Sequence, residues 1–324
     1  MSSPNAKRNS NSNNAPGPLR VEDLLRSGTE RLRRAGVDGP RFNAEKILAR
    51  LLGCDRSQFM VRAHHEVPSE TVAHFERDLR RRELREPLQH IIGETEFWSL
   101  PIRCDARALV PRPDTEVLVR AALDLVKNVP SPRIADIGTG SACIAVAVAH
   151  ERPDARIMAV DIDRDALALA ELNVTRHNLR RQVELIQGDL AGPLTERGLL
   201  GAFDLVVSNP PYIETAELDR LEPEVREHDP RMALDGGRDG LDFIRRLLNE
   251  IFPLLRDEGF LAMEIGAGQA GLVRELIRSH PAWGEMRVIR DHAGIERVIV
   301  ARKENDRCNP SKSRVRSPSM EKSD

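Results

Sequence analysis

The second half of the chain alternates short apolar runs with longer segments whose apolar residues recur every three or four positions. The short runs predict strands at residues 133–137, 157–160, 183–186, 203–207, 260–265, 286–290 and 297–301. The longer segments predict helices at residues 117–126, 142–150, 165–177, 242–255 and 272–279. Because strand and helix in alternation are typical of parallel sheets, we expect an α/β domain with a mostly parallel, seven-stranded sheet over residues 111–302.

The first third of the chain has a different pattern. Residues 19–86 hold three segments with helical apolar spacing, which predict a small helical domain. Pro87 closes this domain, and β-like runs at residues 90–92 and 97–102, separated by Gly93, predict a linking hairpin over residues 87–110. Polar composition predicts disordered tails at residues 1–18 and 303–324.

The charge of the chain is balanced. Its 324 residues include 49 basic and 51 acidic side chains, for a formal net charge of −2. This balance argues against binding of nucleic acid through bulk electrostatics. A basic run at residues 80–82, with Arg85, predicts either a contact with an acidic partner or an ordinary solvated helix face.

Cysteine usage and hydropathy indicate the cellular compartment of the protein. No CxxC pair occurs among the four scattered cysteines, which are Cys54, Cys104, Cys143 and Cys308. This pattern suits a reducing cytoplasm and predicts no metal site. No apolar run reaches the roughly 20 residues of a membrane span, and the N-terminus lacks the apolar core of a secretory signal. We therefore expect a cytoplasmic protein with no membrane partner.

Three predicted strands end in residues that suit a nucleoside ligand. Asp136-Ile137-Gly138-Thr139-Gly140-Ser141 is a strand-to-helix turn whose glycines let the backbone approach a ligand. Asp161 ends the next strand, 23 residues after Gly138, where a carboxylate can accept ribose hydroxyls. Gly188-Asp189-Leu190 ends the third, where Asp189 can accept a hydrogen bond from an adenine amine and Leu190 can cover the ring.

Each of these residues also has an ordinary structural interpretation. Asp161 can simply cap the following helix, and Asp189 can be an exposed turn residue. The turn is not a GxGxxG motif, because Cys143 stands at the third glycine position, so a dinucleotide pyrophosphate is disfavoured. Together, the three strand ends favour S-adenosylmethionine as the ligand.

The fourth strand runs directly into Asn209-Pro210-Pro211-Tyr212. Two prolines stiffen this turn. The Asn209 side-chain oxygen and the Pro210 carbonyl can accept the protons of an NH2 group, and Tyr212 offers a face on which a planar group can stack. The pattern predicts transfer of a methyl group to an amide or amine nitrogen, with a strand-ending turn and a packing tyrosine as the alternative.

With these motifs in place, the chain resembles the HemK/PrmC family of class I methyltransferases, which methylate the glutamine of the Gly-Gly-Gln motif in peptide chain release factors. The resemblance covers residues 87–301. It includes Val110-Pro111-Arg112-Pro113-Asp114-Thr115-Glu116, Ser208-Asn209-Pro210-Pro211-Tyr212, Gly236-Gly237, Asp239-Gly240-Leu241 and Glu264-Ile265-Gly266. The turn after the fourth strand is shared with enzymes that methylate amino groups of nucleic acids. The proline arm (residues 110–116) and the Gly-Gly segment (residues 236–241) are more specific to the family.

The resemblance implies a Rossmann-like fold, S-adenosylmethionine as co-substrate, no metal, and release factors as protein substrate. It also implies roles for single residues. The methionine end of the cofactor would be held by Gly138, Thr139, Gly140, Ser141 and Ala142. Asp161 would hold the ribose, Asp189 and Leu190 would lie by the adenine, and Asn209 would border the cofactor. The glutamine would be bound by Asn209, Pro210, Pro211 and Tyr212, with Asn209 and Pro210 as catalytic residues, and the helical domain would help to hold the release factor.

Two departures from the family pattern stand out. Ala142 replaces a usual third glycine, which is tolerated if residue 142 is already helical. His228-Asp229-Pro230 replaces an aromatic-Glu-Pro segment in a loop at residues 213–241, which we expect near the protein substrate. The alternatives are a methyltransferase for a ribosomal-protein glutamine, an adenine amino methyltransferase and a non-catalytic binding module.

Overall fold

The computed structural model describes residues 19–280 and 282–304. The chain divides into two compact units between Ile92 and Gly93. The predicted tail at residues 1–18 and most of the one at residues 303–324 lie outside the described residues. Lys303 does not belong to a tail: it is the last residue of a strand, and its ammonium group donates to the Leu255 carbonyl at 2.7 Å.

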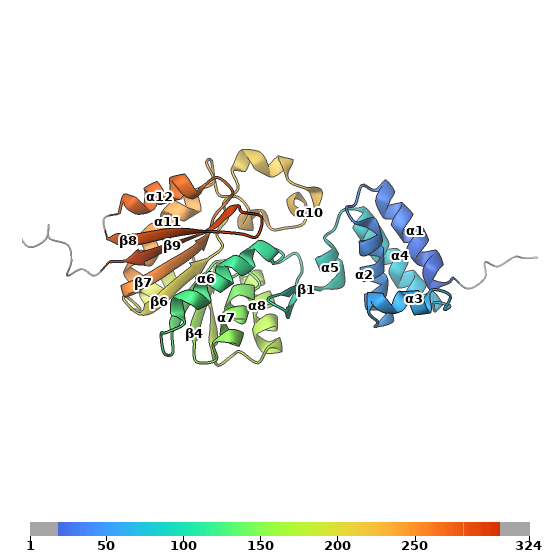
Figure 1. Cartoon of the computed structure of the whole chain (residues 1–324), viewed down its shortest axis with the longest axis horizontal. Helices are drawn as coiled ribbons and strands as arrows, with labels where there is room; N and C mark the ends of the chain where they lie inside the picture. Colours follow the sequence, from blue (N-terminus) through green and yellow to red (C-terminus); the bar gives the residue numbers. More distant parts are fainter. Residues whose placement is uncertain (1–18, 281, 305–324) are drawn as a thin grey trace, which may run out of the picture. The chain divides into compact units, whose positions relative to one another are not determined.

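The N-terminal unit is helical, as its apolar spacing predicts (Figure 1). Its helices are α1 (Val21–Arg34), α2 (Pro40–Leu52), α3 (Phe59–Arg62), α4 (Ser69–Glu83), α5 (Leu88–Ile92) and the short 3₁₀-helix η1 (Arg56–Gln58). The core between them includes Leu32, Ile47, Leu48, Phe75 and Leu79, all fully buried.

The basic run of α4 is engaged within this unit. The Arg81 guanidinium donates to Glu86 at 2.8 Å, and the buried Arg82 donates to the side-chain oxygen of Asn43 at 2.8 Å. Only part of the run is therefore the solvated face that the sequence allowed.

The C-terminal unit begins with the predicted hairpin, formed by β1 (Glu94–Phe97) and β2 (Leu100–Arg103). Its turn residues Trp98 and Ser99 both have positive φ, 54° and 58°, which matches the twist of a two-residue hairpin. The prediction was wrong for residues 90–92, which are the end of α5 rather than a strand. A short apolar run does not distinguish a buried strand from a helical turn.

A seven-stranded sheet forms the core of the C-terminal unit, as predicted. Its strands, in chain order, are β3 (Arg133–Ile137), β4 (Arg156–Asp161), β5 (Val183–Gln187), β6 (Phe203–Ser208), β7 (Leu255–Glu264), β8 (Trp283–Arg290) and β9 (Glu296–Lys303). The spatial order is β5-β4-β3-β6-β7-β9-β8, and only β9 runs antiparallel to its neighbours. The chain moves outward from β3 in one direction and from β6 in the other, so the switch point lies between these two strands.

Helices cover both faces of the sheet (Figure 1). On one face are α6 (Glu116–Val126), α7 (Cys143–Glu151) and α8 (Arg164–Arg176). On the other are α9 (Gly192–Glu196), α11 (Asp242–Ile251) and α12 (Ala270–Arg278). Successive residues of β3 pack on alternate faces of the sheet, with Ile134 in one core and Ala135 in the other, as the two-residue period of a strand requires.

Shorter elements complete the unit. They are η2 (Pro113–Thr115), η3 (Thr215–Arg220), α10 (Pro223–Arg226), η4 (Arg231–Ala233) and η5 (Phe252–Leu254). The helix predicted to reach residue 255 ends at Ile251, because Pro253 lacks the N–H that an α-helix interior requires. No helix among the described residues is both long enough and apolar enough to cross a membrane.

Candidate active site

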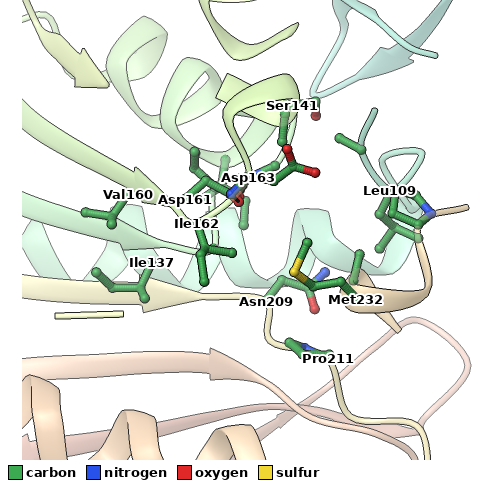
Figure 2. A pocket seen from close by; sticks show the side chains of 18 of the residues that line it. Leu109, Ile137, Ser141, Val160, Asp161, Ile162, Asp163, Asn209, Pro211 and Met232 are labelled. Carbon is green, nitrogen blue, oxygen red and sulfur yellow. Dashed lines mark hydrogen bonds between the residues drawn. The ribbon is translucent and has the colours of Figure 1, made fainter. Parts of the chain in front are cut away.

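A cleft lies at the carboxyl ends of β3, β4, β5 and β6, next to the switch point (Figure 2). It contains about 980 Å³ of space not filled by atoms, a volume that includes open solvent at its mouth. The residues that line it come from the glycine turn, the ends of β4 and β5, the proline arm before α6, and the loop after β6. Segments far apart in the sequence therefore form one site.

The glycine turn between β3 and α7 is fixed by backbone hydrogen bonds. The Gly138 and Thr139 N–H groups both donate to the Val160 carbonyl, at 2.9 and 3.0 Å. Gly138 and Gly140 have φ angles of 73° and 54°, in the left-handed region that favours glycine. A Cβ added at Gly138 would meet nothing within 4 Å, so the backbone there is open to a ligand.

Ala142 is not helical, contrary to the condition under which it was expected to be tolerated. It lies just before α7 with φ 62° and ψ 23°, the left-handed conformation, and it is fully buried. A left-handed conformation strains a residue that carries a Cβ. The position therefore keeps the backbone geometry of a glycine although alanine occupies it, and Ala142 is not among the residues that line the cleft.

Asp161 ends β4 and faces the glycine turn. One carboxylate oxygen accepts the Gly140 N–H at 2.7 Å, and the other accepts the Asp163 N–H at 2.9 Å. Burial raises the pKa of this carboxyl, and these backbone hydrogen bonds oppose the rise. Asp161 thus holds the turn in place while its side chain lines the cleft.

Asp189 and Leu190 also line the cleft, after β5. The Leu190 side chain is buried, with φ 48°. Asp189 is half exposed, and its carboxylate accepts a hydrogen bond from Arg246 of α11 at 2.8 Å. In this conformation Asp189 is therefore committed to an ion pair on the cleft rim.

The loop after β6 brings only part of its motif to the cleft. Asn209 and Pro211 line it, whereas Pro210 is buried and Tyr212 is not among the lining residues. The Tyr212 ring packs against the core on the α11 side, and its hydroxyl donates to Glu264 at 3.2 Å. The stacking face expected of Tyr212 is thus partly used in packing.

Several residues at the site had no role assigned from the sequence. Thr115 and Glu264, both buried, form a hydrogen bond of 2.7 Å beside Asn209. Arg112 of the proline arm pairs with Asp229 at 2.7 Å, and Asp229 is buried. The available signal was the same one that identified Asp161, because Glu264 is also a carboxylate at the end of a predicted strand.

The loop at residues 213–241 reaches the cleft. Pro230, Met232 and Ala233 line it, and the Asn209 and Met232 side chains are both drawn among its lining residues in Figure 2. Burial raises the pKa of Asp229, and the neighbouring Arg112 opposes this rise. The loop and the proline arm are therefore joined by an ion pair at the cleft.

The residues fit an adenosine with an amino-acid tail. Gly138 and Gly140 leave backbone open, Asp161 supplies a carboxylate at the end of β4, and Ile162, Ala166 and Leu190 are apolar residues of the lining. No group of three histidine, cysteine, aspartate or glutamate side chains that could hold a metal ion occurs among residues 19–280 and 282–304.

Comparison with known proteins places both units in known families. The family described as PrmC N-terminal domain matches residues 23–93, and that described as Methyltransferase small domain matches residues 114–224. The chain is 40% identical to "Release factor glutamine methyltransferase" of Moorella thermoacetica over 283 residues, which cover 87% of this chain and 98% of that protein. It is 41% identical to the protein of the same name from Geobacter sulfurreducens, over 84% of this chain and 92% of that one.

Among solved structures, the catalytic domain of hMettl16, in complex with the MAT2A 3′UTR hairpin 6, is similar in fold. Its TM-score is 0.52 at 16% identity, with 74% of this chain and 83% of that chain covered. At this identity the likeness concerns the fold alone.

Proposed function

Because the chain belongs to the release factor glutamine methyltransferases, we propose that it transfers a methyl group from S-adenosylmethionine to the side-chain amide nitrogen of the glutamine in the Gly-Gly-Gln motif of peptide chain release factors. The observation that carries this proposal is the position of Asn209. Asn209 lines a cleft whose lining also includes the glycine turn and Asp161. A methyl donor bound at the glycine turn and a methyl-accepting amide bound at Asn209 can therefore meet at the switch point of the sheet.

We assign the cofactor contacts to the strand ends. Gly138, Thr139, Gly140 and Ser141 would hold the amino-acid end, with Ala142 shaping the turn from behind. Asp161 would accept the ribose hydroxyls, and Asp189 and Leu190 would border the adenine, with Asp189 first leaving Arg246. Bound S-adenosylmethionine supplies an electrophilic methyl group.

Methyl transfer to an amide nitrogen requires a rigid turn that offers hydrogen-bond acceptors to the NH2 group. An amide nitrogen is a weak nucleophile, since its lone pair is delocalised into the carbonyl. The Asn209 Oδ1 and the Pro210 carbonyl would accept its two protons, orient the nitrogen and stabilise positive charge that develops there. Pro211 would contact the planar amide, Tyr212 would do so with the part of its ring that is not packed against the core, and Asn209 would also border the cofactor.

The other units of the chain complete the proposal. Residues 19–86 would contribute to holding the release factor, which is supported by the match to the PrmC N-terminal domain. We propose a cytoplasmic location, since the scattered cysteines suit a reducing compartment. We expect no direct contact with nucleic acid and no membrane partner.

The proposal is tested with S-adenosylmethionine labelled in its methyl group. The full chain is incubated separately with a bacterial release factor, the same factor with its Gly-Gly-Gln glutamine replaced, ribosomal proteins and DNA. We expect label only in the unaltered release factor. Label in the altered factor, in ribosomal protein alone or in DNA alone would overturn the assignment of the substrate.

The role of Asn209 is tested by Asn209→Ala, with Asn249→Ala as a matched control on the exposed face of α11. We expect Asn209→Ala to abolish steady-state turnover, leaving only a slow single-turnover rate, and largely to preserve binding of S-adenosylmethionine, because the amide serves the methyl acceptor more than the methyl donor. The control should keep wild-type turnover. Wild-type turnover in Asn209→Ala would contradict the mechanism.

A further inference from the structure

A short chain of hydrogen bonds begins at the Asn209 amide and ends on a buried carboxylate. The Asn209 Nδ2 donates to the Thr115 hydroxyl at 3.2 Å, and that hydroxyl donates to Glu264 Oε2 at 2.7 Å. The Tyr212 hydroxyl donates to the other carboxylate oxygen at 3.2 Å. Thr115 and Glu264 are only 2% and 1% exposed, so solvent does not compete for these bonds.

The buried carboxylate is an acceptor on both oxygens. Burial raises the pKa of Glu264, and hydrogen bonds from Thr115 and Tyr212 oppose the rise. The Arg297 guanidinium also lowers this pKa, whereas Asp114 raises it. Both donated hydrogen bonds favour the ionised form, in which the carboxylate oxygens only accept.

The order of donors along the chain follows from proton counting. A threonine hydroxyl has one proton and two lone pairs. Because the Thr115 hydroxyl donates its one proton in the hydrogen bond to the Glu264 carboxylate, the Thr115 oxygen can only accept a hydrogen bond from any other neighbour. The Asn209 amide must then present its NH2 group, because its oxygen would otherwise face another oxygen with no proton between them.

This order selects one of the two orientations of the Asn209 amide. With the NH2 group held by Thr115, the amide oxygen is the end that remains for a ligand. The substrate NH2 group, which receives the methyl, donates hydrogen bonds and therefore needs that oxygen. A flipped Asn209 amide would place its own NH2 protons against those of the substrate. We propose that Glu264, acting through Thr115, is a positioning residue that orients Asn209 toward the nitrogen to be methylated, which rests on the function proposed above.

The test is a double-mutant cycle between residues 115 and 209. Thr115→Val keeps the shape of the side chain and removes the hydroxyl, whereas Thr115→Ser keeps the hydroxyl. We expect Thr115→Val to lower kcat roughly 10- to 100-fold, as expected for the loss of a buried hydrogen bond at a reacting group. Binding of S-adenosylmethionine should stay within about twofold, and Thr115→Ser should restore most of the rate.

The cycle separates positioning from general damage to the fold. If Thr115 acts only through Asn209, Thr115→Val lowers the residual single-turnover rate of Asn209→Ala no further. An equal loss in both backgrounds, an unchanged kcat in Thr115→Val, or a Thr115→Ser variant as slow as Thr115→Val would overturn the inference. If Thr115→Val does not bind S-adenosylmethionine, Thr115→Ala replaces it in the same cycle.

The outcomes also distinguish this inference from the proposed function. A fully active Asn209→Ala variant would overturn both, because no amide would then need orientation. An inactive Asn209→Ala variant together with a fully active Thr115→Val variant would overturn only the role of Glu264 and Thr115.

Discussion

Gly240 contacts the turn at residues 209–212, which we call the acceptor turn because we propose that it holds the acceptor amide. Replacing Gly240 by alanine tests how rigidly that turn is held. Its φ is 70°, and an added Cβ would lie 2.4 Å from the Tyr212 carbonyl oxygen and 2.7 Å from the Gln269 side-chain nitrogen. Gln269 donates to that same carbonyl at 2.9 Å. Alanine must therefore displace the Tyr212 backbone by about 1 Å to reach ordinary contact distances.

Gly198 provides a matched control. It has the same φ of 70°, but an added Cβ there would meet nothing within 4 Å. Both alanines incur about 1 kcal/mol of left-handed strain. Gly240→Ala also loses the Gln269 hydrogen bond and crowds a packed turn, which brings the expected total to about 3 kcal/mol.

Thermal unfolding and methyl transfer measure the two consequences. For a unit of this size, 1 kcal/mol corresponds to about 2–4 °C in Tm. A displacement of about 1 Å at a reacting group can lower the rate about 100-fold, so we expect that loss of kcat in Gly240→Ala and none in Gly198→Ala. Equal kcat and equal Tm in the two variants would refute the view that this loop holds the acceptor turn.

Two further predictions concern buried carboxylates. Arg112→Ala leaves the Asp229 carboxylate without its cation, and we expect a loss of about 2 kcal/mol, reduced because the Arg112 side chain is 40% exposed. Adding Asp229→Asn should recover most of that loss in chemical denaturation, and an Arg112→Ala variant as stable as the wild type would contradict the pairing. Burial raises the pKa of Asp136 from 3.8 to about 7. Because the folded state binds the Asp136 proton more tightly than the unfolded state does, the free energy of unfolding should fall as pH rises from 3.8 to about 7. Asp136→Asn should flatten that fall. An unchanged pH profile of stability in the variant would contradict the raised pKa of Asp136.

The fold was predictable because the strands of a parallel sheet are short, apolar and bounded by turn residues. The run at residues 203–207 predicted β6, and it is buried along its whole length. The positions of Asp161 and Asn209 at the cleft were predictable for the same reason, since a residue that ends such a strand lies at one edge of the sheet. Conversely, the apolar residues 90–92 are part of a helix, because a short run does not determine its own period.

Pairings between distant segments were not predictable from the pattern. Thr115 and Glu264 are separated by 149 residues and Arg112 and Asp229 by 117, and nothing in either local sequence specifies its partner. The left-handed conformation of Ala142 was hidden as well, since alanine favours a helix by its own propensity. Tertiary structure imposes that conformation on the residue.

The sheet itself sets the spacing across the reaction centre. Ile137 of β3 and Ser208 of β6 are register partners, and the Ser208 hydroxyl also donates to the Ile137 carbonyl at 2.7 Å. The next residues along the two strands, Gly138 and Asn209, begin the glycine turn and the loop after β6, so their separation starts from the roughly 4.8 Å between neighbouring strands. In the proposed mechanism, the hydrogen bonds between β3 and β6 thus set the distance between methyl donor and acceptor. A change in the length or sequence of the loop at residues 213–241 would leave that distance unaltered.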